Sequence, residues 1–166
     1  MKKLMISLSA LLILTGFACA KKVNLPIKTS LGDLVKVEKK DKVPTDKETI
    51  AAKADEDVYV LNFEGQKEIV LNDVPMSDAF KLAQFPLVDS AGKNFVSVFV
   101  GGPAKDGAVS TEKVSLSGSM TGKADGKFWV TGGKLEFPEA KVTLVYVVPK
   151  NASLTFKDGG QQYPIN

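Results

Sequence analysis

The sequence predicts an all-β protein that folds as an antiparallel β-sandwich of seven to nine short strands. Three observations predict this class. Apolar residues alternate with polar ones in many short runs, Gly, Pro, Asn and Asp mark turns about every ten residues, and helical periodicity is almost absent. A chain of 166 residues is long enough for one such domain with a hydrophobic core.

The central strand is predicted at residues 142–149, which read V-T-L-V-Y-V-V-P. One face of this strand carries Val142, Leu144, Tyr146 and Val148, and the other carries Thr143, Val145 and Val147. Both faces are mostly apolar, so we expect the strand to be covered from two directions near the middle of a sheet. Pro149 ends it, because proline cannot donate to the ladder.

Residues 1–20 are predicted to be a signal peptide, so the protein is expected to be exported. Lys2 and Lys3 provide the positive start, and residues 4–17 form an apolar run. That run is shorter than the roughly 20 residues that a membrane-spanning helix needs. Small residues at 18–20 complete the cleavage signal.

Two outcomes of processing stay open. We expect cleavage after Ala20, which releases the chain into the periplasm or the extracellular space. The alternative is lipidation of Cys19, because a cysteine that closes an apolar signal is where bacterial lipoproteins are cut and acylated. A lipid on Cys19 is the one way in which we expect this chain to be held at a membrane.

The remaining chain is predicted to consist of a tether at residues 21–30 and a sandwich at residues 31–166. Further strands are predicted at 31–37, 57–64, 68–71, 113–120, 152–157 and 162–165, and Gly118 is expected to mark a bulge.

The other segments are predicted from turn residues and charge. Residues 49–54 fit either a short strand or a helical turn, 76–84 one or two helical turns, 85–99 a hairpin, and 127–138 either a hairpin or a bend between two strands. The charged segment 38–47 and the glycine-rich segment 100–109 are predicted to be loops.

Composition excludes several classes of function. The sequence contains no Arg, no His, and no Cys after Cys19. Ser-His-Asp triads, Cys-His nucleophiles, the usual zinc sites and disulfide frameworks are therefore excluded. Without Lys2 and Lys3, 20 lysines face 19 acids, so the net charge is only +1. We therefore expect no nucleic-acid binding, no cofactor and no enzymatic activity.

The densest acidic cluster is Asp55, Glu56 and Asp57. Carboxylate oxygens of this kind can bind Ca²⁺, but the spaced aspartates of a calcium loop are missing. We therefore predict no metal site, and expect these acids to be the solvated start of a strand.

Trp129 and Phe128 are the candidate ligand contacts. With Phe137 and Tyr146 they could line a groove for a glycan or a peptide, because exposed aromatic rings stack on flat partners. The favoured interpretation is that these rings pack in the core of the sandwich.

Four segments carry a family resemblance: G-D-L-V-K-V at 32–37, V-Y-V-L-N-F at 58–63, P-L-V-D-S-A-G-K-N-F at 86–95, and V-T-L-V-Y-V-V-P-K-N-A-S-L-T-F at 142–156. Their order resembles the telokin-like, immunoglobulin-like domains of exported bacterial proteins and lipoproteins. The resemblance implies an immunoglobulin-like β-sandwich in the cell envelope or outside the cell. It implies no binding residues.

Two functional hypotheses follow. The first is an exported, non-enzymatic interaction or structural module of the cell envelope, with an envelope or extracellular protein or glycan as its partner. The alternative is a secreted glycan- or peptide-binding domain that uses the sheet aromatics and the loop at 101–126.

Overall fold

The computed structural model describes residues 23–79, 81–124 and 126–166, and these form an all-β protein built from antiparallel sheets. The predicted fold class is therefore confirmed. The strands, in chain order, are β1 (Ile27–Thr29), β2 (Gly32–Lys40), β3 (Lys42–Pro44), β4 (Thr49–Ala51), β5 (Glu56–Glu64), β6 (Glu68–Leu71), β7 (Val74–Pro75), β8 (Leu87–Asp89), β9 (Asn94–Phe95), β10 (Phe99–Pro103), β11 (Val109–Ser110), β12 (Ser115–Gly122), β13 (Phe128–Glu136), β14 (Lys141–Pro149), β15 (Leu154–Asp158) and β16 (Gln161–Pro164). The helical elements are α1 (Met76–Ala79) and two 3-10 turns, η1 (Lys105–Gly107) and η2 (Thr111–Lys113).

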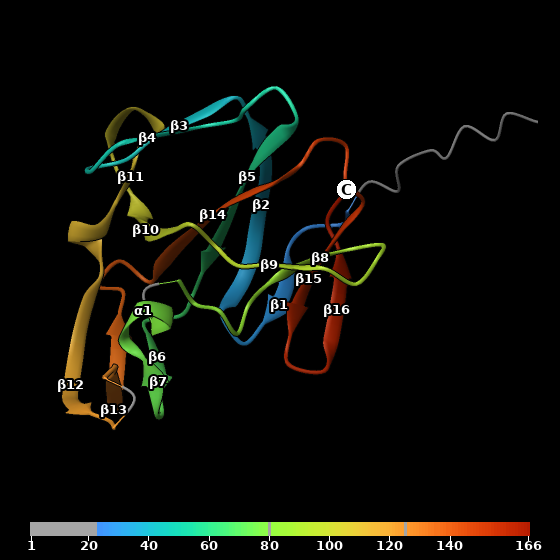
Figure 1. The fold of residues 1–166 in the computed structure, drawn as a ribbon. Helices are drawn as coiled ribbons and strands as arrows, with labels where there is room; N and C mark the ends of the chain where they lie inside the picture. The colour runs from blue at the N-terminus through green and yellow to red at the C-terminus, as the bar shows by residue number, and fades with distance from the viewer. Residues whose placement is uncertain (1–22, 80, 125) are drawn as a thin grey trace, which may run out of the picture.

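The largest sheet has six strands in the order β1-β2-β5-β14-β10-β11, and it crosses the middle of the molecule (Figure 1). The predicted central strand, β14, pairs along its whole length with β5 and over part of it with β10. Leu144 and Tyr146 on one face and Val145 on the other are all fully buried. The prediction that β14 is covered on both faces is confirmed.

Two four-stranded sheets pack against one face of the six-stranded sheet. One contains β12, β13, β6 and β7, and the other contains β16, β15, β8 and β9; they lie toward opposite sides of the molecule in Figure 1. All three sheets contribute to a single hydrophobic core, in which Phe63 of β5, Leu135 of β13 and Phe156 of β15 are fully buried. This shared core holds the layers together.

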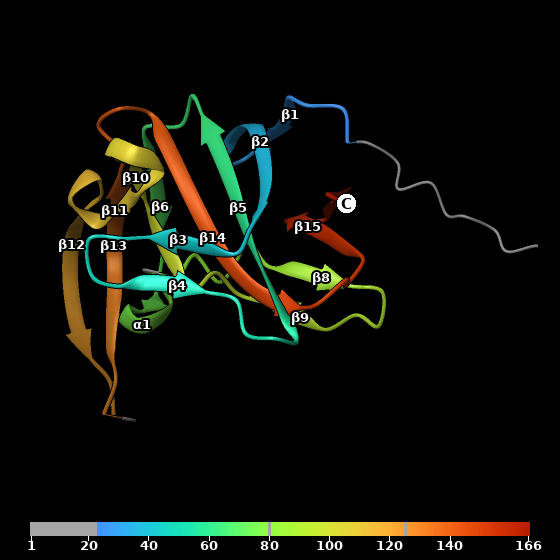
Figure 2. The ribbon, with the colours of Figure 1, turned by 90° about the horizontal axis from the view of Figure 1, so that it is seen from above.

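The hairpin β3–β4 lies over the other face of the six-stranded sheet, as Figure 2 shows. The smaller core beneath it consists of Val43, Val58, Val60, Phe99, Val109 and Val145. Asp46, in the turn of the hairpin, accepts hydrogen bonds from the backbone N–H and the hydroxyl of Thr111 at 2.8 and 2.6 Å. These contacts fix the hairpin over β10 and β11.

The predicted tether and the first predicted loop both contain paired strands. β1 lies within residues 21–30 and pairs with β2, so the folded region begins before residue 31. The charged segment 38–47 was expected to be a loop, but β2 continues through Lys40 and β3 follows it. Alternating charges fit in this strand because they form ion pairs: Glu38 with Lys36 and Lys40, and Lys39 with Asp57 of β5.

The glycine-rich segment 100–109 was also predicted to be a loop, but half of it is strand, and only residues 104–108 connect the strands. β10 occupies its first half, and Gly101 and Gly102 are buried there. A Cβ on Gly101 would lie 2.6 Å from the carbonyl oxygen of Ser110, so glycine permits the close approach of β10 and β11. The glycines therefore mark close packing here.

Residues 128–136 form one continuous strand, β13, so the prediction of a hairpin or of a bend between two strands at 127–138 is wrong. The glycine pair interrupts no strand, although Gly132 has a positive φ of 59°.

The register of β12 against β13 shifts between Ser117 and Ser119, so the ladder is irregular at Gly118, as predicted. The extra residue lies on β13 and not on β12, because Gly132 and Gly133 together face Gly118. The helical prediction at 76–84 corresponds to α1, a single turn. In the part of the chain that the structure describes, no helix is long and apolar enough to cross a membrane.

Candidate functional site

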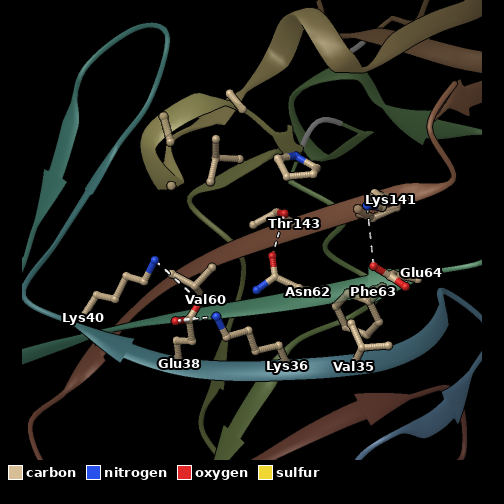
Figure 3. Close-up of a pocket in the computed structure, with 16 residues that line it drawn as sticks. Val35, Lys36, Glu38, Lys40, Val60, Asn62, Phe63, Glu64, Lys141 and Thr143 are labelled. Atoms are coloured by element: carbon tan, nitrogen blue, oxygen red, sulfur yellow. Dashed lines mark hydrogen bonds and ion pairs between the residues drawn. The ribbon is translucent and has the colours of Figure 1, made fainter.

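A pocket of about 310 Å³ opens on the face of the six-stranded sheet that the β3–β4 hairpin partly covers (Figure 3). Side chains of β2, β5 and β14 form its floor and part of its rim. Residues 103–104 and 107–109, from the end of β10 to the start of β11, form its wall. The wall belongs to the segment 101–126, which the alternative functional hypothesis assigned to ligand binding.

The floor is a cross-strand pair between Asn62 of β5 and Thr143 of β14. The Thr143 hydroxyl donates a hydrogen bond to Asn62 Oδ1 at 2.9 Å, and Thr143 is buried. Because Oδ1 accepts this bond, the orientation of the amide group is fixed. Asn62 Nδ2 points away from Thr143 in Figure 3, where it is available as a donor to a ligand.

The rim on the β2 side is a row of three charged residues. Lys36 Nζ lies 2.9 Å from Glu38 Oε1, and Lys40 Nζ lies 3.6 Å from Glu38 Oε2. A register shift between Leu34 and Lys36 brings Lys36 opposite Asn62. Alternation along the strand then places all three charged side chains on the pocket face.

The opposite rim carries one more ion pair, in which Lys141 Nζ lies 3.8 Å from Glu64 Oε1. Lys141 and Glu64 face each other across β14 and β5. Lysines outnumber carboxylates around the pocket by three to two, so its net charge is +1. A positive rim around a hydrogen-bond donor is suited to an anionic group.

The carboxylate of Glu38 is held in its ionised form. Partial burial raises the pKa of this group, but hydrogen bonding to Lys36 and the charges of Lys40 and Lys36 more than offset that effect. The pKa of Glu38 is therefore lower than the ordinary value, and Glu38 is a weak proton acceptor at neutral pH.

The two predicted ligand contacts, Trp129 and Phe128, lie on opposite faces of β13. They are neighbours in one strand, so their side chains point to opposite sides. Phe128 shares its face with buried Val130 but is 63% exposed, because it extends past the end of the core. The two rings therefore form no common groove.

Trp129 was expected in the core, but it lies on the outer face of its sheet, opposite Thr121 and Pro75. Its ring is covered by the ammonium of Lys123, which lies 3.7 Å from the ring centroid. Lys123 is held there by Asp73 at 2.8 and 3.0 Å. A cation over the ring stabilises this arrangement and occupies the surface that a ligand would stack on.

The other two aromatic candidates, Phe137 and Tyr146, are fully buried in the main core, as the favoured interpretation predicted. The Tyr146 hydroxyl donates to the carbonyl oxygen of Phe85 at 2.7 Å. Burial raises the pKa of Tyr146 well above its ordinary value. This phenol therefore stays neutral and serves the packing of the core.

The acidic cluster at 55–57 differs from the prediction at one residue. Asp57 was expected to be solvated, but it is only 4% exposed. Its carboxylate accepts from Lys39 Nζ at 2.8 Å and from the backbone N–H of Asn151 at 2.9 Å. The described residues contain no group of three or more acidic or other ligating side chains that could hold a metal ion.

Acid is expected to destabilise the protein through Asp57. Desolvation raises the pKa of this group, but the bonds from Lys39 and Asn151 outweigh it, so the pKa is lowered. A lowered pKa in the folded state stabilises the protein above the unfolded pKa of about 4, and this contribution is lost as the pH falls through the folded value. The free energy of unfolding from urea titrations should therefore decrease below about pH 4.

The matched variants for this prediction are Asp57→Asn and, at an exposed neighbouring position, Asp55→Asn. Asp57→Asn should be less stable at pH 7 and should lose less stability than the parent between pH 5 and 3. Asp55→Asn should follow the parent. Equal pH slopes for Asp57→Asn and the parent would contradict the role of this ion pair.

The pocket residues were not predicted from the sequence, although the sequence contains one signal that points to them. Asn62 and Thr143 are polar residues on faces of otherwise apolar central strands, which is where a buried polar pair or a site floor occurs. That the two are paired depends on the register of β5 and β14. Cys19 and the predicted signal peptide lie outside the residues that the structure describes.

Neither a family model, nor a curated protein, nor a solved structure matches this chain. The resemblance to telokin-like domains therefore stays a prediction.

Proposed function

We propose that this protein is an exported, non-enzymatic interaction module of the cell envelope, and that its pocket binds carboxylate groups of an acidic glycan or peptide. The carrying observation is the arrangement of Lys36, Lys40 and Lys141 around the Asn62 amide. Ammonium groups attract a carboxylate, and the amide N–H gives it a fixed hydrogen bond on the floor.

The chemistry of the pocket favours binding over catalysis. Its one hydroxyl, on Thr143, donates its proton to an amide oxygen, which is not a base. Activation of a hydroxyl nucleophile needs an adjacent general base. Glu38 has a lowered pKa, and the sequence provides no His for the role.

Export and the envelope setting are supported by the sequence. The positive start, the apolar run and the small residues at 18–20 are typical of a secretory signal. The telokin-like resemblance is with domains of exported proteins and lipoproteins. Lipidation of Cys19 would keep the module at the membrane, and cleavage after Ala20 would release it.

The alternative, a secreted glycan- or peptide-binding domain, uses the same pocket but no longer includes the sheet aromatics as ligand contacts. Residues 103–104 and 107–109 supply the wall, and they belong to the segment 101–126 that this alternative uses. Trp129 and Phe128 contribute nothing to this pocket, because they lie on a different sheet.

The proposal is tested by titrating the protein with oligogalacturonate, poly-L-glutamate and a neutral oligosaccharide while binding is followed by NMR chemical shifts. We expect binding of an acidic probe, shifts centred on Asn62 and Thr143, and weaker binding at high salt. Whether the sugar or the peptide probe binds better distinguishes the two ligand classes.

The double variant Lys36→Gln/Lys141→Gln changes the net charge of the pocket from +1 to −1 while its floor is kept. Affinity for the acidic probe should fall by about tenfold, the effect of two partly exposed charge contacts. Lys93→Gln, in the turn between β8 and β9, removes a lysine that does not line this pocket and should bind like the parent. Equal affinity of the double variant and the parent, or equal binding of the neutral sugar, would refute the proposal.

A further inference from the structure

The outer edge of β12 is a long unpaired strand edge. β12 has eight residues and pairs with β13 on one side only. The other terminal strands of the described sheets, such as β1, β9, β11 and β16, have two to four residues. Residues 114–122 contain neither a charge nor a proline, which are the usual protections of an edge. Such an edge is a template for another strand.

We propose that β12 pairs with β12 of a second copy of this chain, in antiparallel orientation with Gly118 opposite Gly118. This inference is independent of the pocket. Antiparallel partners that face each other lie on the same side of the sheet. The proposed register satisfies this condition along the whole strand.

The inner face of β12 gains an apolar pair in this register. Leu116 of one copy lies opposite Met120 of the other, and this contact occurs twice by symmetry. Met120 is 60% exposed in the single chain, and Leu116 is half-buried. Pairing therefore removes from water part of an apolar side chain that is mostly exposed in the isolated protein.

The outer face gains hydroxyl pairs. Ser117 of one copy lies opposite Ser119 of the other, and Ser115 lies opposite Thr121. All four residues are exposed in the single chain. Ser and Thr pairs across strands form hydrogen bonds, and none of them introduces a repelling charge.

The charges at the two ends of the edge also match. In the same register Lys113 of one copy approaches Lys123 of the other, and each brings a bound carboxylate. Lys113 Nζ lies 2.6 Å from Glu139, and Lys123 Nζ lies 2.8 Å from Asp73. Each end of the proposed β12–β12 interface would therefore contain two positive and two negative charges, which balance.

The test is the mass of the purified protein in solution, measured by sedimentation and light scattering over a range of concentrations. The parent should have twice the mass of one chain. Ser117→Lys/Ser119→Lys places lysine opposite lysine at two symmetric contacts, and should raise the dissociation constant by about tenfold or more.

The matched control is Ser117→Lys/Ser119→Glu, which changes the same two exposed residues but places lysine opposite glutamate of the other copy. This variant should remain a dimer. Met120→Lys, which puts a charge opposite Leu116, provides a second disrupting variant if the double lysine variant fails to fold by circular dichroism.

Three outcomes would overturn the inference. A parent that sediments as a single chain at every concentration excludes the pairing. A disrupting variant that folds and dimerises as tightly as the parent excludes this edge. Equal weakening in both double variants excludes the register with Gly118 at the centre.

Discussion

Val145→Asp is expected to abolish the cooperative thermal unfolding transition. Val145 is fully buried at the centre of β14, between Val60 of β5 and Phe99 of β10. Its neighbours in the smaller core are apolar and include no hydrogen-bond partner for a carboxylate. Burying an unpaired polar or charged group there costs several kcal/mol, and the lost packing adds to it. That sum is comparable to the whole stability of a small domain, roughly 5 to 15 kcal/mol.

The matched control is Val70→Asp, which makes the same change on the outer face of β6. Val70 is 55% exposed and lies opposite Lys134, so the new carboxylate remains solvated near a positive charge. Its free energy of unfolding should change by about 0.5 kcal/mol or less. Thermal unfolding of both variants, followed by circular dichroism, tests this difference. A Val145→Asp protein that melts like the parent would show that the β3–β4 hairpin does not close the second core.

The central strand could be predicted because its pattern is local. Alternating apolar residues on both faces of 142–149 indicate burial from two sides, whatever covers them. The strand alternative for residues 49–54 is confirmed by β4, but the hairpin was missed because the segment that contains β3 is rich in Lys, Asp and Glu and has the composition of a loop. It pairs because Val43 and Ile50 face the small core and the charged residues around them remain in solvent.

The glycines were misread for a related reason. Sequence alone does not distinguish a glycine that permits a turn from one that permits two strands to approach closely. At Gly101 the second applies, because the Ser110 carbonyl occupies the space of a side chain. That distinction depends on which strands pair across the sheet, and this pairing joins residues that are far apart in the sequence.

The pocket could not be assembled from the sequence, because its residues come from four segments that are distant along the chain. Lys36, Asn62 and Lys141 come together only through the registers of β2, β5 and β14 and through the bulge in β2. The aromatic residues Trp129 and Phe128 were candidate ligand contacts by residue type alone, with core packing as the favoured interpretation. An exposed ring such as Phe128 and a ring covered by a lysine, such as Trp129, cannot be distinguished from composition.

Phe63→Ala is expected to have the second largest effect, a loss of about 3–5 kcal/mol in the free energy of unfolding. Phe63 is fully buried on β5, and its ring lies against Phe156 of β15 with 5.3 Å between the ring centroids. Truncation removes most of the buried side chain and leaves a cavity that β5, held by β2 and β14, cannot collapse to fill. The equivalent change at the exposed ring, Phe128→Ala, should leave stability nearly unchanged.

The same residue tests whether the sheet of β15 packs on the six-stranded sheet. Urea titrations of Phe63→Ala, Phe156→Ala and the double variant form a thermodynamic cycle. If the two rings share one core, the losses should not add, and the coupling energy should be about 0.5–1.5 kcal/mol. Additive losses would mean that the rings do not touch in solution. The six-stranded sheet would then be covered on this face by the β12–β13 sheet alone, and the layer formed by β8, β9, β15 and β16 would have to unfold independently.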